Sequence, residues 1–297
     1  MDALTLFAAV VRGCLFAGIL VSLGAVAFRW LVLPRSGEAD PRAARAGAVA
    51  GATAAILLLP TLVALFGLQL AAFRDPMAPL SEDMSLLLSL GWGRVWMVQV
   101  SLALLLLLSF TFAVGGRPLP WIAATLLALG LGFTPALSGH ASSVPNLVPL
   151  AIAADGLHVA SAGTWVGTLF VLTVVCFRSP PSPAPVFLAR IQAFSPVALG
   201  CAVVIVTTGT FGAFLHLHHL AELWTTPYGR ALSLKLLLFA GVVILGAYNW
   251  RRATPRLRAG ADPSQMARSI YAEIGMAALV VLVTAWFVAT APPEVPA

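Results

Sequence analysis

The sequence predicts an all-α polytopic membrane protein, a bundle of eight transmembrane helices. Hydrophobic residues make up 60% of the 297 positions and charged residues only 9%, and the mean hydropathy is +0.96. Soluble domains carry roughly 25% charged residues, so this composition excludes an ordinary soluble protein. The apolar stretches long enough to cross about 30 Å of hydrocarbon are 5–33, 44–67, 93–114, 118–138, 150–177, 195–217, 231–250 and 270–290.

Each apolar stretch is expected to be a helix, because inside lipid the backbone polar groups pair only within a helix or a closed barrel. The first four stretches form an N-terminal half at 1–138. The stretch at 5–33 is longer than the apolar core of a signal peptide and lacks a small-residue cleavage site, which favours a retained helix. The loop at 68–92, which contains Ser81-Glu82-Asp83, is expected to include a short amphipathic helix.

The last four stretches form a C-terminal half at 139–297, so that 1–297 is one integral membrane domain. Their inner connection at 179–186 is rich in proline, which predicts a stiff spacer. An aromatic-Gly-Arg sequence opens the third stretch as Trp92-Gly93-Arg94 and the seventh as Tyr228-Gly229-Arg230. Both halves have four spans in the same orientation, so this recurrence favours two parallel four-helix repeats.

Arginine and lysine are distributed unequally between the two sides of the predicted bundle. Twelve lie on one side: Arg29, Arg35, Arg42, Arg45, Arg117, Arg178, Arg190, Arg251, Arg252, Arg256, Arg258 and Arg268. Five lie on the other: Arg12, Arg74, Arg94, Arg230 and Lys235. The positive-inside rule therefore places both termini outside the cytoplasm, in the periplasm for a bacterial inner membrane. The formal net charge of +6 reflects this bias and predicts contact with the lipid bilayer, not with nucleic acid.

All five histidines fall on the predicted outer side, in or just inside a loop: His140, His158, His216, His218 and His219. A chain with so few polar residues has little reason to gather imidazoles at one face unless they bind something. Imidazole is a good ligand for copper, zinc, nickel and iron. The histidines are therefore candidate ligands of a transition metal.

Asp155 and His158 are the most informative pair. They are three residues apart on one predicted helix, so they share a face, and His158 is expected about 12 Å inside the membrane. Ionisable residues within a span are costly and mark functional sites. A carboxylate beside an imidazole also fixes the tautomer that binds metal. The structural alternative is a buried histidine hydrogen-bonded to a neighbouring helix.

The other histidines are candidates for the outer rim of the same site. His216, His218 and His219 end the sixth apolar stretch and Glu222 follows them, so metal contact competes with simple anchoring of a helix end. His140 lies in a turn-like stretch close to the start of the fifth helix. The candidate metal ligands are thus His158, His140, His216, His219, His218 and Asp155.

Sulfur ligands are a second possibility. Thioethers and thiols bind Cu(I), although methionine is more often packing material. The outer candidates are Met77, Met84, Met97 and Cys14, and Cys176 and Cys201 lie towards the inner side. The three cysteines form no C-x-x-C pair, which disfavours a disulfide frame or a thiolate cluster.

Short motifs in the second half resemble the bacterial copper-resistance protein D (CopD/PcoD) family. They are Gly139-His140-Ala141, Ala154-Asp155-Gly156-Leu157-His158, Trp165-Val166-Gly167, Phe194-Ser195, Thr208-Gly209, Thr226-Pro227-Tyr228-Gly229-Arg230, Lys235 and Gly246-Ala247-Tyr248-Asn249. The first half is similar only through Ala27-Phe28-Arg29 and Trp92-Gly93-Arg94-Val95-Trp96. The resemblance implies an eight-helix inner-membrane protein that takes up copper ions and works with a periplasmic copper-binding protein of the CopC type.

Three functions fit these observations. The first is a copper importer that is not an enzyme: the outer histidines accept copper, and an inside-negative potential favours inward movement by about 2.3 kcal/mol per charge per 100 mV. No Walker A or phosphorylation motif is present, so no ATP-driven mechanism is expected. The second is a b-type haem or quinol redox protein, which needs two axial histidines at similar depth. The third is a metal sensor or scaffold without transport.

Overall fold

A computed structural model describes residues 3–37, 40–139, 147–177, 182–217 and 219–288. Within those ranges the chain is helical and contains no strand, which confirms the all-α prediction. Eight helices are long and apolar enough to cross a membrane: Ala3–Ser36, Pro41–Phe73, Gly91–Ala113, Pro118–Ser138, Val148–Phe177, Ala184–His216, Pro227–Arg258 and Pro263–Phe287. The protein is therefore a multi-pass membrane protein.

Several spans are built from more than one helical segment. The α-helices are α1 (Ala3–Ala27), α2 (Pro41–Phe73), α3 (Leu80–Ser89), α4 (Gly91–Ala113), α5 (Pro118–Ser138), α6 (Val148–Ala162), α7 (Thr168–Phe177), α8 (Ala184–His216), α9 (Glu222–Thr225), α10 (Pro227–Tyr248), α11 (Thr254–Arg258) and α12 (Pro263–Phe287). The π-helical turns are η1 (Phe28–Val32), η4 (Gly163–Gly167) and η5 (Asn249–Ala253), and η2 (Pro34–Ser36) is a 3₁₀ turn. The short helix expected within 68–92 is α3.

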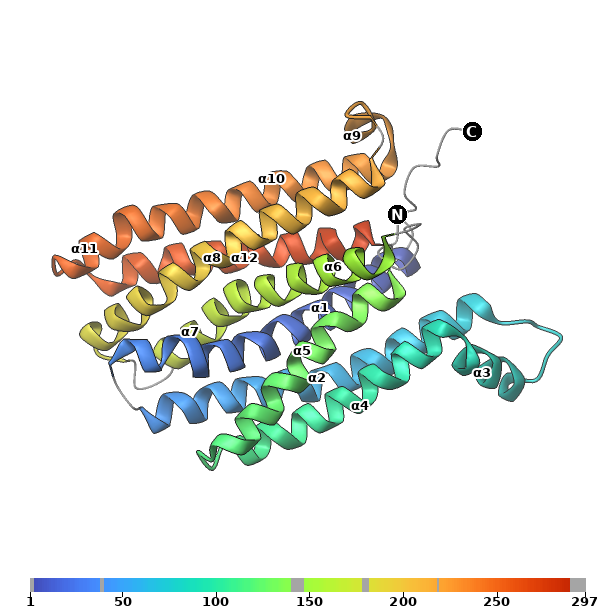
Figure 1. The fold of residues 1–297 in the computed structure, drawn as a ribbon, viewed down its shortest axis with the longest axis horizontal. Helices are drawn as coiled ribbons and strands as arrows, with labels where there is room; N and C mark the ends of the chain where they lie inside the picture. The colour runs from blue at the N-terminus through green and yellow to red at the C-terminus, as the bar shows by residue number, and fades with distance from the viewer. Residues whose placement is uncertain (1–2, 38–39, 140–146, 178–181, 218, 289–297) are drawn as a thin grey trace.

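The long helices run side by side, and α1 is central to the bundle (Figure 1). It packs against α2, α5, α7 and α12. In the first half α2 packs on α4 and α4 on α5, whereas in the second half α6 packs on α8 and α10 on α12. The helices α3 and α9 lie at the end of the bundle where the chain termini lie, and α11 lies at the opposite end (Figure 1).

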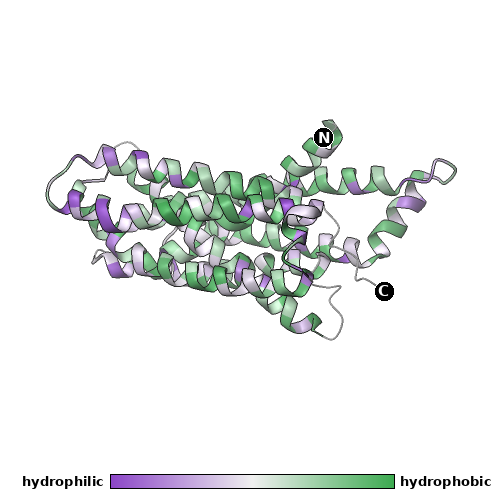
Figure 2. Ribbon diagram, turned by 90° about the horizontal axis from the view of Figure 1, so that it is seen from above, coloured by the Kyte–Doolittle hydropathy of each residue, from purple (hydrophilic) through white to green (hydrophobic). Residues whose placement is uncertain are grey.

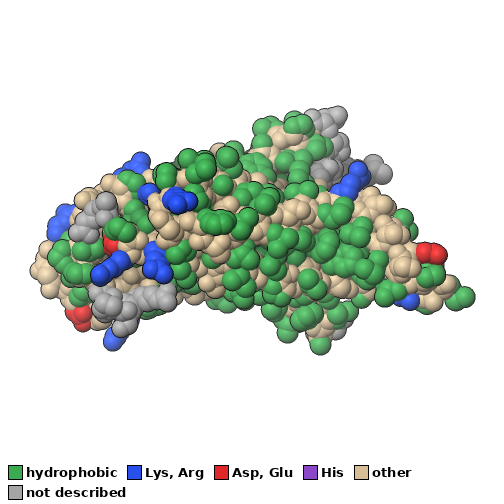
Figure 3. Space-filling model, turned by 90° about the horizontal axis from the view of Figure 1, so that it is seen from below, with side chains coloured by type: hydrophobic (Ala, Val, Ile, Leu, Met, Phe, Trp, Pro, Cys, Tyr) green, Lys and Arg blue, Asp and Glu red, His purple; other side chains and the backbone are tan. Residues whose placement is uncertain are grey.

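Polar residues gather towards the ends of the bundle and leave a predominantly hydrophobic middle (Figure 2). On the face seen in Figure 3, arginine and lysine side chains cluster at the end that carries α11. The helices at that end extend beyond the predicted apolar stretches: α8 begins at Ala184 and α12 at Pro263. Proline in the first turn of each helix, and Asp262 capping α12, allow these polar extensions to begin as helix.

A close helix crossing joins the first span to the fifth. Gly24 of α1 lies directly against Gly167 of η4, so that a Cβ atom on either residue would overlap the backbone of the other helix. The hydroxyl of Thr168 donates to the carbonyl oxygen of Gly24 at 3.3 Å across the same contact. Small residues let helix backbones approach closely in membranes, where van der Waals packing drives association.

Replacing Gly167 with alanine is expected to destabilise the bundle by about 1–3 kcal/mol or more, because the added methyl group meets backbone that cannot rotate away. The measurement is the thermal unfolding midpoint of purified protein in detergent. Gly275→Ala is the matched control, because a Cβ atom at Gly275 in α12 has open space around it. Equal midpoints for the two variants would show that the crossing is not tight.

Candidate functional site

The predicted pair Asp155 and His158 lies on α6, in the half of the fifth span nearest the chain termini (Figure 1). His158 is ten residues from the first residue of α6, which places it about 15 Å along the helix. Both side chains are partly buried against neighbouring helices. The pair is therefore inside the span, as the sequence predicts.

The imidazole of His158 is oriented by α8. Its Nδ1 atom lies 3.0 Å from the hydroxyl oxygen of Thr208. That hydroxyl donates its only proton to the carbonyl oxygen of Val204 at 2.7 Å, so it accepts from an Nδ1–H of His158. The neutral ring then carries its lone pair on Nε2, the nitrogen that can bind a metal ion.

The spacing predicts that Asp155 orients the ring of His158, and in the structure the hydrogen-bond partner of that ring is Thr208. The structure, which describes both residues, contains no hydrogen bond between Asp155 and His158, and Thr208 occupies the orienting position instead. Asp155 interacts electrostatically with Lys235 of α10 and with His216 of α8. The carboxylate on α6 therefore faces groups from two other helices, because α6 turns it towards α10 and the end of α8.

Lys235 was not among the predicted site residues, and it lies deeper than its apolar stretch suggests. The helix α10 begins at Pro227, so Lys235 is eight residues inside it, about 12 Å along the axis. Its ammonium nitrogen lies 5.6 Å from the ring centroid of Phe287. A lysine at that depth within an apolar stretch indicates a functional site, and it can be recognised from the sequence. Thr208 cannot, because nothing in the sequence distinguishes it from other polar residues.

His216 is the last residue of α8 and lies nearer than His158 to the end of the bundle that carries α9. Its Nδ1 donates to the carbonyl oxygen of Gly212 at 2.8 Å, which leaves the ring lone pair on Nε2. The ring of Tyr228 lies 6.2 Å away, centroid to centroid. Eight residues separate Thr208 from His216 on α8, about 12 Å of helix rise, so His158 and His216 occupy different depths.

Of the other predicted ligands His219, His140 and His218, the structure describes only His219. His219 is exposed, and its carbonyl oxygen accepts from the amide of Glu222 at the start of α9. His140 and His218 lie outside the described residues. Among the residues that the structure describes, no group of three or more histidine, cysteine, aspartate or glutamate side chains is close enough to hold a metal ion.

Four of the six sulfur candidates are exposed. Met77 is 92% exposed, and Met84, Met97 and Cys14 are also exposed. The other two cysteines are less exposed: Cys201 is partly buried, and Cys176 is buried beside Arg190. The exposure of the four outer residues offers no support for a sulfur site within the bundle.

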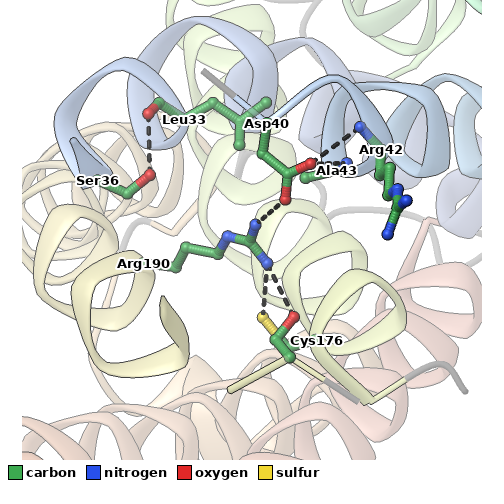
Figure 4. Close-up of polar contacts among 8 residues, drawn as sticks. Leu33, Ser36, Asp40, Arg42, Ala43, Cys176 and Arg190 are labelled. Atoms are coloured by element: carbon green, nitrogen blue, oxygen red, sulfur yellow. Dashed lines mark hydrogen bonds and ion pairs between the residues drawn. The ribbon is translucent and has the colours of Figure 1, made fainter. Parts of the chain in front are cut away.

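A second polar cluster, at the end opposite the histidines, centres on Arg190 of α8 (Figure 4). Its guanidinium is 2% exposed, forms an ion pair with Asp40, and donates to the hydroxyl of Ser182 at 3.0 Å and to the sulfur of Cys176 at 3.7 Å. Asp40 also caps α2 by accepting from the amides of Arg42 and Ala43.

The ionisation of Asp40 is shifted by this arrangement. Burial raises the pKa of Asp40, but the amide of Ala43 together with the hydrogen bond and charge of Arg190 lower it further, so its pKa lies below the usual value. The carboxylate is therefore held charged against Arg190. The pair joins the start of α2 to α8 across 150 residues of sequence.

Comparison with known proteins identifies relatives over both halves. Residues 1–147 match the family model described as copper resistance protein D-like, N-terminal domain, and residues 188–287 match the model described as copper resistance protein D. The chain is 29% identical over 210 residues to the copper transport protein CutJ of Bacillus subtilis (strain 168). That match covers 69% of this chain but only 38% of the relative's length. No solved structure matches the chain.

Proposed function

The chain belongs to the copper resistance protein D family, and from this premise we propose that it binds copper between α6, α8 and α10 and mediates copper import. The observation that carries the proposal is His158, an imidazole within a span whose Nδ1 is occupied by Thr208. Imidazole suits copper, and a ligating histidine usually has its other nitrogen hydrogen-bonded in this way.

The different depths of the two described inner histidines favour a path with two stations. His216, with the rim residues His140, His218 and His219, forms the outer station, and His158 forms the inner one. Asp155 lies one turn of α6 outward from His158, between the two. Lys235 interacts electrostatically with Asp155, so an incoming cation would compete with the lysine for the carboxylate.

The depth difference also bears on the redox alternative. Two axial ligands of one haem iron must lie at the same depth on facing helices, and about 12 Å of helix rise separates His158 from His216. Copper movement inward between stations needs no such match. A periplasmic copper-binding protein of the CopC type would deliver the ion to the outer rim, which we place on the periplasmic face of the bacterial inner membrane.

The orientation of the bundle gives a direct prediction. Reporters that are active only in the cytoplasm should be active when fused after residue 260, in the connection between α11 and α12, because arginines cluster there. The same reporters fused after residue 288 should be silent, because α12 carries the chain back across the membrane. The reverse pattern would place the histidines on the cytoplasmic side and contradict an import path that begins with them.

Copper uptake by purified protein in liposomes tests the transport half of the proposal. A potassium diffusion potential of about 100 mV, inside negative, should increase the equilibrium accumulation of a singly charged ion roughly 50-fold over zero potential. His158→Ala should reduce uptake to that of empty liposomes. Copper binding without uptake by the wild-type protein would instead indicate a sensor or scaffold.

A further inference from the structure

A buried carboxylate lies in the half of the bundle opposite the histidines. Glu273 of α12 is ten residues from the start of its helix, about 15 Å along it, and is 3% exposed. The indole of Trp165 in η4 donates to its Oε1 at 3.2 Å, and the amide of Asn249 in η5 donates to its Oε2 at 2.8 Å. Side chains from two other spans therefore donate to one carboxyl group.

Both donors come from π-helical turns. Trp165 lies in η4 and Asn249 is the first residue of η5. Isolated π-helical turns within α-helices are rare and occur frequently at functional sites. Two such turns that present neutral donors to the same buried carboxyl group indicate that the group is placed for a purpose beyond packing.

Within the described residues, Glu273 forms no ion pair with a cationic side chain. The ionisable residues of α6, of the helices packed against α12 and of α12 itself are Arg12, Cys14, Asp155, His158, Cys176, Tyr228, Arg230, Lys235, Tyr248, Arg251, Arg252, Arg256, Arg258, Arg268 and Tyr271. In the described part of the chain none of them forms an ion pair with Glu273. A charged carboxylate without a partner raises the free energy of a membrane protein. Protonation of Glu273 or binding of a cation would remove this unfavourable charge.

The side-chain amide of Asn249 can hydrogen-bond to Glu273 in either its charged or its neutral form. Asn249 is 8% exposed, and its Oδ1 has no hydrogen-bond partner among the described residues. In the present orientation its amide donates to a carboxylate, and after a half-turn of the amide Oδ1 would accept the proton of the neutral acid. Either orientation leaves one amide atom without a partner, so Asn249 does not lock Glu273 in a single protonation state.

A second polar group lies between Glu273 and the start of α12. Ser269 is one turn from Glu273 on the same face of α12, and its hydroxyl oxygen is buried without a partner among the described residues. Internal water molecules commonly hydrogen-bond to buried polar atoms that have no other partner. The groups next to the Glu273 carboxyl are N–H donors and an amide oxygen, and they include no imidazole or sulfur that would favour copper.

We propose that Glu273 is an intramembrane proton-binding site, which takes up a proton from the inner side and returns it there. Trp165 is seven residues beyond His158 in the same span, about 10 Å along the axis, so the site lies inward of the proposed copper station. A cation arriving near His158 would favour the charged carboxylate and release its proton to water. Only this coupling rests on the proposed function; the proton site does not.

Infrared difference spectroscopy of the full chain in lipid nanodiscs tests the proposal. Between about pH 5 and pH 9, the wild-type protein should show a carboxylic-acid C=O band that titrates, with the neutral-to-ionised ratio changing about tenfold per pH unit. Glu273→Gln should remove that band, and Glu273→Asp should keep it at a shifted frequency. Glu82→Gln, which alters an exposed glutamate of α3, should leave the band unchanged.

A band that persists in Glu273→Gln, or a wild-type spectrum without a titrating band, would overturn the proton site. If Glu273→Gln does not fold, the shift in Glu273→Asp still assigns the band. The copper arm is separate: adding copper to the wild-type protein at the midpoint pH should diminish the band, and His158→Ala should abolish that change while preserving the pH titration. If copper does not bind, the proposed function is wrong. The pH titration of the band still tests the proton site at Glu273.

Discussion

Replacing His158 with alanine is expected to abolish stoichiometric copper binding by the purified protein. The substitution removes the imidazole whose lone-pair nitrogen is set by Thr208, and alanine is well tolerated within a helix, so the fold should persist. Thr208→Val should weaken copper affinity by about 10–100-fold, because it removes only the partner that orients the ring. The measurement is copper bound per molecule after equilibrium dialysis.

Leu157→Ala is the control for this experiment. Leu157 precedes His158 on α6 but is 50% exposed on the surface of the bundle, so its truncation should leave copper binding unchanged. Copper binding is compared between His158→Ala and wild-type samples that have the same yield and the same helical content. Wild-type stoichiometry in that variant would remove His158 from the site.

Asp40→Asn is expected to destabilise the protein by about 3 kcal/mol, the lower end of the range for breaking a buried ion pair. The change leaves the Arg190 guanidinium buried without a charged partner, whereas the asparagine oxygen still caps α2. The lower end applies because the side chain of Asp40 is itself 27% exposed. The thermal unfolding midpoint in detergent measures the effect.

Asp262→Asn provides a matched control, because Asp262 caps α12 in the same way but lies at the exposed end of its helix without an ion pair. It should change the midpoint little. The pH dependence has a definite sign: since Arg190 helps to depress the pKa of Asp40, the stability from the pair is complete above the ordinary aspartate value of about 3.9 and is lost as pH falls through the lower folded value. Asp40→Asn should lack that acid-dependent component, and an unchanged profile would contradict the assigned role.

Hydropathy predicted the fold because lipid leaves an apolar chain few alternatives to helices, and eight spans are present. The same reasoning placed Asp155 and His158 within a span. It missed contacts between distant segments, such as Thr208 with His158 and Asp40 with Arg190, because periodicity along one helix does not specify its neighbours. The sequence could have identified Glu273 as a candidate functional residue, because a glutamate inside the last apolar stretch is itself unusual.

We propose that copper is bound by imidazole nitrogen inside the membrane, and X-ray absorption spectroscopy at the copper edge identifies the ligand atoms. With one equivalent of copper, the wild-type protein should show the multiple-scattering features of imidazole ligands, and His158→Ala, which is expected not to bind copper stoichiometrically, should lack them. A first shell of sulfur alone, unchanged in His158→Ala, would move the site to methionine or cysteine and contradict the account.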